Sequence, residues 1–194
     1  MKKRLFLAAV VVFCVAFLAS GTVAYFTAED TAHNVITSGA VNVQIEEWQE
    51  TEDGLVAYPE EDVCIMPGSI VSKIVQVKNL DAGSYIRAKF DLVFTFDNIP
   101  AGETPPTIPE NLVTLNIDDE NWIRVEGDDE WWYYNATVEE DGVTEPFFTE
   151  VVFSGPEMGN EYQNCTVEVI VQAQAVQAAN NGSSVIEAAG WPEN

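Results

Sequence analysis

The chain is poor in basic residues and in histidine, and both shortages restrict what it can bind. Its 194 residues include 8 lysines and arginines against 32 aspartates and glutamates. Three of the basic residues lie within the first four positions, so the chain from Tyr25 onward keeps five of them and carries a net charge of −27. Such a surface repels nucleic acids and anionic membranes, and at low salt it also repels copies of itself. We therefore expect no nucleic-acid partner.

The sequence also lacks the usual motifs of catalysis. The single histidine, His33, cannot form the zinc-binding H-E-x-x-H motif, and it lies too close to the start of the exported chain to build a catalytic triad. There is no G-x-S-x-G, no C-x-x-C and no glycine-rich phosphate loop. We therefore predict that the protein is not an enzyme, with no catalytic residues and no cofactor.

Carboxylates are abundant, but they cluster where turns are expected. The acidic clusters are residues 60–62, 118–120, 128–130 and 139–141. A solvated acidic surface explains them best, while a pair of acids for glycoside hydrolysis and weak calcium binding are the alternatives. Because no EF-hand loop of the D-x-[DN]-x-[DN]-G type occurs, we assign no metal ligands.

No apolar run is as long as the roughly 20 residues that a membrane-spanning helix needs. The run Leu5–Ala19 follows a basic start and leads into small residues that end at Ala24. This is the pattern of a secretory signal peptide. We predict a signal helix over residues 1–24, cut between Ala24 and Tyr25 by a signal peptidase, so that membrane contact ends with cleavage. An uncleaved N-terminal anchor is the alternative.

Only three cysteines occur, and Cys14 belongs to the signal segment. Cys64 and Cys165 remain in the exported chain. An even number of cysteines in an oxidising compartment indicates a disulfide between them. Two buried thiols that behave as small apolar side chains are the alternative.

A period of two residues dominates the chain after residue 25 and predicts strands. Val41, Val43 and Ile45 alternate with polar residues, and the β-branched and aromatic content supports strands over helices. Residues 69–80 show the same pattern with a slip in the alternation. We predict eight or nine strands, the clearest being residues 40–48, 69–80, 84–96, 122–127, 131–138, 146–154 and 165–177. In residues 84–96, one face should carry Tyr85, Arg87, Lys89 and Asp91, and the other Ile86, Ala88, Phe90 and Leu92.

Turn signals separate these strands. Pro67 and Gly68 predict a type II turn, residues 127–130 a hairpin tip, and the proline-rich residues 97–111 a long excursion. Near the C-terminus, Ser183 or Ser184 could cap one helical turn. We predict an all-β protein, an antiparallel, jelly-roll-like β-sandwich over residues 40–194, preceded by an N-terminal strand segment over residues 25–39.

The aromatic run Trp131–Tyr134 allows two interpretations. In a strand, alternate residues of this run face the core and the others cover an edge or a partner. Core packing is the favoured interpretation, and an exposed aromatic ladder for a carbohydrate or a protein partner is the other.

Four stretches in order resemble one family. They are "GTVAYFTAEDTAHNVITSGAVNVQIEEW" (21–48), "IMPGSIVSKIVQVKNLDAGSYIRAKF" (65–90), "NWIRVEGDDEWWYYNATVEEDGVTEPFFTEVVFSG" (121–155) and "VEVIVQAQAVQAANN" (167–181). These stretches resemble the SipW-dependent secreted proteins of the TasA/camelysin (CalY) family.

The resemblance implies a jelly-roll-like sandwich that is processed by a SipW-type signal peptidase and placed at the cell surface or in the biofilm matrix of a Gram-positive bacterium. In fibre-forming members of the family, the N-terminal segment completes the sheet of the next subunit. Camelysin carries a peptidase label, but this sequence has no set of metalloprotease ligands.

The N-terminal segment is therefore the candidate assembly strand. Tyr25, Phe26, Val35 and Ile36 are its apolar anchors. Cleavage would free the segment to dock on the sheet of another subunit, giving a filament of identical chains. Insertion into its own sheet and disorder are the alternatives. We predict a structural subunit of a fibre or matrix; a camelysin-like secreted protease and a carbohydrate- or partner-binding surface module are the alternative functions.

Overall fold

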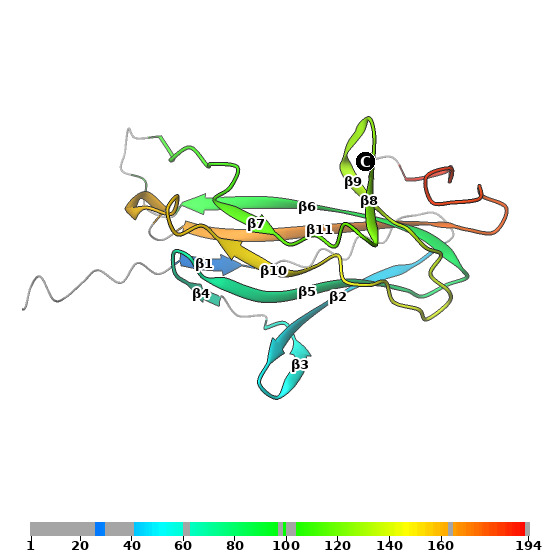
Figure 1. Cartoon of the computed structure of the whole chain (residues 1–194), viewed down its shortest axis with the longest axis horizontal. Coiled ribbons are helices and arrows are strands. Elements are labelled where there is room, and N and C mark those ends of the chain that lie inside the picture. The colour runs from blue at the N-terminus through cyan, green and yellow to red at the C-terminus, as the bar shows by residue number, and fades with distance from the viewer. Residues whose placement is uncertain are drawn as a thin grey trace, which may run out of the picture.

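Two β-sheets form the body of the protein, as the computed structural model shows (Figure 1). The structure describes residues 26–29, 41–59, 63–96, 99, 104–162 and 165–192. Strands account for 52% of the described residues and helices for 2%, which confirms the all-β prediction. The strands are β1 (Phe26–Glu29), β2 (Val43–Thr51), β3 (Gly54–Ala57), β4 (Val63–Ile65), β5 (Ile70–Asn79), β6 (Ser84–Phe96), β7 (Val113–Leu115), β8 (Trp122–Val125), β9 (Asp128–Tyr134), β10 (Phe148–Phe153) and β11 (Cys165–Gln177), with a short 3₁₀ helix, η1, at Asn160–Tyr162.

In each sheet, strands from the first half of the chain lie next to strands from the second half. One sheet has the order β4-β1-β11-β6-β9-β8, and the other has the order β3-β2-β5-β10-β7. Among the described strands, every pairing is antiparallel except that of β1 with β11, which is parallel. The long strands β6 and β11 pair along their whole lengths and form the centre of the first sheet.

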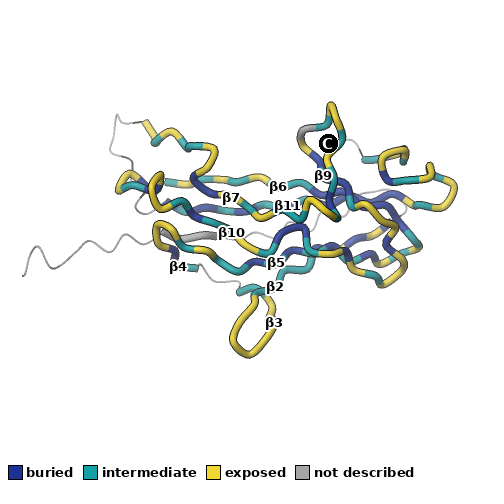
Figure 2. The backbone as a smooth tube through the Cα atoms, in the orientation of Figure 1, coloured by how far each residue is buried: buried dark blue, intermediate teal, exposed yellow. Residues whose placement is uncertain are grey.

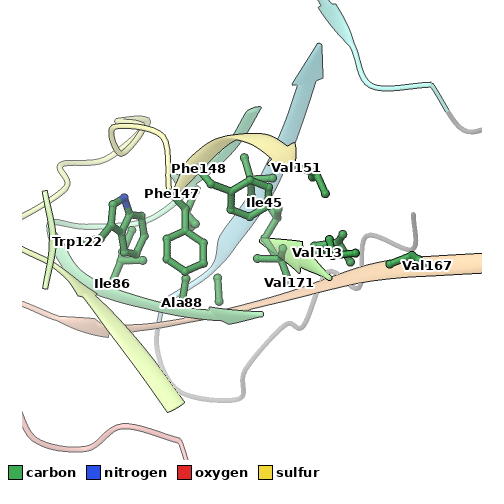
Figure 3. Close-up of a cluster of buried hydrophobic side chains, with 14 of the residues drawn as sticks. Ile45, Ile86, Ala88, Val113, Trp122, Phe147, Phe148, Val151, Val167 and Val171 are labelled. Carbon is green, nitrogen blue, oxygen red and sulfur yellow. The ribbon is translucent and has the colours of Figure 1, made fainter. Parts of the chain in front are cut away.

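A shared apolar core lies between the sheets, because alternate residues of each strand point inward. Buried residues alternate with more exposed ones along the tube in Figure 2. At one end of this main core, Trp122 and Phe147 are fully buried with ring centroids 4.9 Å apart. Figure 3 shows both rings beside Ile86 and Ala88 of β6, with Val167 of β11 farther along the core.

The outer face of the first sheet carries a second, smaller core. The buried residues of this second core are Tyr85, Trp131, Tyr133, Val176 and Val185. Ile86 and Ala88 face the main core and Tyr85 faces the second, so the two faces predicted for residues 84–96 are confirmed. Residues 178–192, here called the C-terminal strap, follow β11 and supply Val185 and Trp191 to this second core.

The predicted turn at residues 66–69 is present. The backbone N–H of Ser69 donates to the carbonyl of Met66 at 3.0 Å. Gly68 has φ +80°, as the third position of a type II turn requires. Residues 126–127 form the turn of the β8–β9 hairpin, so the hairpin is as predicted but the tip expected at 127–130 is wrong for residues 128–130, which belong to β9.

Other expectations need adjustment or lie outside the described residues. The helical turn expected near Ser183 is a single hydrogen-bonded turn, in which the N–H of Glu187 donates to the carbonyl of Ser184 at 3.1 Å. Residues 104–111 of the proline-rich excursion contain no strand, as predicted. The signal helix of residues 1–24 lies outside the described residues.

Candidate functional site

The N-terminal strand β1 lies inside a sheet of its own chain. It pairs in parallel with β11, where Thr27 lies opposite Thr166. It also pairs antiparallel with β4, where Thr27 lies opposite Cys64. We call this place in the sheet, between β4 and β11, the β1 position.

The strand β1 connects the edge strand β4 to the rest of the first sheet. Among the described strands, β4 pairs only with β1, and β11 pairs with β1 on one side and β6 on the other. Removing β1 would leave residues Thr166–Glu168 of β11 as an open edge and β4 without a neighbour in this sheet. Open edges readily accept another strand, so the β1 position is a site for strand addition.

The candidate assembly residues fall partly in this strand. The backbone of Phe26 lies in β1. Tyr25, Val35 and Ile36 lie outside the described residues, as do the cleavage residue Ala24 and His33. Self-insertion, one of the three alternatives for the N-terminal segment, is thus the arrangement seen for Phe26–Glu29 in the single chain.

The strand β1 also separates Cys64 from Cys165. Cys64 lies on β4 and Cys165 lies on β11, with β1 between them. Two strand spacings place these backbones about 9–10 Å apart, whereas a disulfide needs Cα atoms within about 7 Å. A Cys64–Cys165 disulfide is therefore incompatible with β1 in this position.

A buried ion pair, which the sequence analysis missed, crosses the second sheet. Lys73 of β5 and Glu47 of β2 point into the main core with their Nζ and Oε2 atoms 3.0 Å apart. The Nζ of Lys73 also lies 4.0 Å from the centre of the Tyr58 ring. Glu47 Oε1 is buried and accepts no hydrogen bond from the part of the chain that the structure describes.

Burial controls the protonation of this pair. It raises the pKa of Glu47 from 4.5 to about 7 and lowers the pKa of Lys73 from 10.5 to about 7, because each charge has lost its water. The contact between them acts in the opposite direction on both groups, since each charge favours the ionised form of the other. Burial, and then the charge of Glu47, raise the pKa of Tyr58 to about 12. Each of the two groups is therefore kept ionised by the charge of its partner.

A second charged group is buried on the outer face of the first sheet. The guanidinium carbon of Arg87 lies 4.3 Å from the ring centre of Trp131 and 4.7 Å from that of Trp191. Its Nε and Nη2 atoms both donate to Gln174 Oε1, at 2.9 and 2.6 Å. Nη2 also donates to the carbonyl of Pro192 at 3.3 Å, which ties the end of the C-terminal strap to β6.

The aromatic run 131–134 is thereby accounted for by packing. Trp131 and Tyr133 belong to the second core, while Trp132 and Tyr134 pack against the main core. Trp131 is 3% exposed and Tyr133 is 7% exposed. The favoured interpretation, core packing, is confirmed for this run, and its side chains form no exposed ladder in this arrangement.

The described residues contain neither a cluster of metal ligands nor a membrane-spanning helix. Within them, no group of three or more histidine, cysteine, aspartate or glutamate side chains is placed to hold a metal ion. The acidic cluster 60–62 lies outside the described residues. None of the helices in the described part of the chain is long and apolar enough to cross a membrane.

Comparison with known proteins gives no relative for the chain. No protein-family model, no curated protein and no solved structure matches it.

Proposed function

We propose that the protein is a secreted structural subunit of a cell-surface fibre or biofilm matrix, and that its subunits join by strand insertion at the β1 position. The observation that carries this proposal is the pairing of β1, a separate short strand, between β4 and β11. The resemblance to SipW-dependent secreted proteins supports export from a Gram-positive bacterium, removal of a signal helix and a jelly-roll-like connection of the strands.

The β1 position suits exchange between subunits because it is formed by backbone pairing with β4 and β11. Main-chain hydrogen bonds to β4 and β11 would be the same whether β1 came from the same chain or from a neighbouring copy. Residues 30–42 connect β1 to β2. A segment of this length can reach at most about 45 Å, about the length of the 13-residue strand β6.

Exchange of this kind is open-ended. Each subunit would give its β1 to one neighbour and receive β1 from another, so the contact is head-to-tail and does not close on itself. Proteolytic processing would control the start of assembly, because an uncleaved chain holds residues 25–39 next to the membrane.

Deletion of residues 25–38 tests the proposal. We expect the mature chain that starts at Tyr25 to form filaments visible by electron microscopy, and the deleted chain to remain a folded monomer because its β1 position is empty. A synthetic peptide of residues 25–38, added in excess to the intact chain, should shorten the filaments, whereas a peptide of scrambled sequence should not.

Two results would count against assembly by strand insertion. Filaments that persist after the deletion would show that β1 is not the connecting strand. A deleted chain that has lost its circular dichroism and its cooperative melting would show that β1 is a required strand of its own domain.

The net charge predicts how assembly responds to the solvent. A mature chain with a charge of −27 repels its neighbours, so acid, added salt or divalent cations should speed the growth of filaments. Light scattering at several concentrations of sodium and calcium chloride measures this. Faster growth at neutral pH and low ionic strength would contradict the prediction.

A further inference from the structure

The C-terminal strap, residues 178–192, turns back from the end of β11 and ends beside the β8–β9 hairpin (Figure 1). One end continues β11, where the N–H of Ala178 donates to the carbonyl of Gly83 at 2.9 Å. At the other end, Trp191 packs edge-on against Tyr133 with ring centroids 5.7 Å apart. The strap therefore covers the second core and the stacked guanidinium of Arg87.

A single side-chain amide joins the two ends of the strap. Asn181 Nδ2 donates to the carbonyls of Gln177 and Ala189, each at 3.0 Å. Asn181 Oδ1 accepts from the N–H of Ala189 at 2.9 Å. Both amide protons and the amide oxygen are thus engaged, and every one of these partners is a backbone group.

The residue that follows Asn181 makes this amide chemically vulnerable. Gly182 has φ +77°, and a Cβ atom at this position would lie 2.9 Å from the carbonyl carbon of Glu187, so the turn requires glycine. Without a side chain on residue 182, its backbone nitrogen can approach the amide carbon of the preceding asparagine. A cavity of about 200 Å³, lined by Asn181, Ala189 and Pro192 among others, lies beside the amide and gives room for water.

We propose that Asn181 is a deamidation site whose conversion releases the C-terminal strap. The backbone nitrogen of Gly182 bonds to Cγ of Asn181 and loses its proton, and Nδ2 leaves with that proton as ammonia. The resulting succinimide ring is opened by one water molecule to give aspartate or isoaspartate. The reaction consumes only water and needs no oxidant, reductant or enzyme.

The product cannot remake the two bonds that the amide donates, and only the bond accepted from the N–H of Ala189 remains open to a carboxylate oxygen. A carboxylate oxygen would replace Nδ2 and face the carbonyl oxygens of Gln177 and Ala189, with no proton to share between them. Two donated hydrogen bonds would become two repulsive contacts. While the strap is closed, its three bonds restrain Cγ of Asn181 and slow the ring closure. Conversion therefore takes place while the strap is open. Because it is irreversible, the strap then stays open.

The direct test compares Asn181→Asp with Asn180→Asp in the full chain. Asn180 is exposed and also lies in the turn, so its substitution adds the same charge one residue away. Hydrogen exchange measured by mass spectrometry over residues 178–192 is the readout. We expect exchange of the Ala189 amide to become faster by about tenfold or more in Asn181→Asp, since loss of the two bonds that Nδ2 donates opens the strap and exposes this amide. The Asn180→Asp strap should exchange like that of the wild type.

Ageing of the wild-type protein tests the chemistry itself. During incubation at mildly alkaline pH, peptide mapping should find aspartate and isoaspartate at position 181 earlier than at Asn135 or Asn180. The converted fraction should show the fast exchange of Asn181→Asp. Slower conversion of Asn181 than of these other asparagines would overturn the proposal. So would a strap that stays protected after conversion, or equally fast exchange in Asn180→Asp. The proposal does not depend on filament assembly, because all these measurements can be made on monomers.

Discussion

Replacing Lys73 by methionine is expected to lower the free energy of unfolding by about 3–5 kcal/mol at neutral pH, because it leaves the carboxylate of Glu47 buried without its counter-charge. Lys73 is 1% exposed and methionine has a similar length, so loss of packing volume contributes little. The other buried oxygen of Glu47, Oε1, has no hydrogen-bond partner among the described residues that could stabilise the unpaired carboxylate. Chemical denaturation of both proteins measures the difference.

The double variant Lys73→Met/Glu47→Leu is the matched control. It removes both charges and leaves an apolar pair of similar volume, a change that is often neutral or stabilising in other proteins. We therefore expect the double variant to recover most of the stability that the single variant loses. A double variant that is no more stable than Lys73→Met would show that the loss does not come from the unpaired charge of Glu47.

The pH dependence of Lys73→Met separates charge burial from packing. Burial raises the pKa of Glu47 in the folded state to about 7, above its ordinary value of 4.5. In Lys73→Met the pKa lies higher still, because the cation that favours the carboxylate is gone. The folded variant therefore favours the protonated acid: the penalty is absent below pH 4.5, grows as the pH rises above that value, and levels off above the folded pKa. The stability deficit of Lys73→Met should shrink on acidification in the same window. A deficit that is the same at pH 4 as at pH 8 would assign it to packing alone.

The length of the strands decided how much of the fold could be predicted. β6 and β11 have 13 residues each, and their alternation gave the predicted bounds 84–96 and 165–177. The strands β3, β4 and β7 have three or four residues, too few for a period of two to stand out from chance. Their positions are set by pairing with distant neighbours, which one sequence does not reveal.

The buried polar groups were visible in the sequence but were not interpreted. The slip noted in residues 69–80 arises at Lys73, which occupies a core-facing position in line with Val75 and Val77. Glu47 stands in the same relation to Val43 and Ile45 on β2. A charged residue at an inward position of a strand was the available signal, and two such residues on different strands predict a buried pair. The C-terminal strap gave no comparable signal, because its contacts lie on the face opposite to the main core.

Replacing Trp122 by alanine is the second change with a large expected effect, a loss of about 3–5 kcal/mol in the free energy of unfolding. The indole is fully buried, with its ring centroid 4.9 Å from that of Phe147 and 5.2 Å from that of Tyr134. Its Nε1 donates to the carbonyl of Glu145 at 3.2 Å, so the substitution also leaves that carbonyl without this donor. For a domain of this size the loss corresponds to a fall of about 6–20 °C in Tm.

Two further variants show what the loss at Trp122 measures. Trp122→Phe keeps an aromatic ring but not the indole N–H, so we expect it to lose clearly less stability than Trp122→Ala. Leu55→Ala removes an apolar side chain that is 61% exposed on β3, and it should change stability by no more than about 0.5 kcal/mol. If Trp122→Ala cost no more than Leu55→Ala, the aromatic end of the main core would not be closed in solution. The sheet containing β8 and β9 would then be held by its backbone pairing with β6 rather than by burial of these rings.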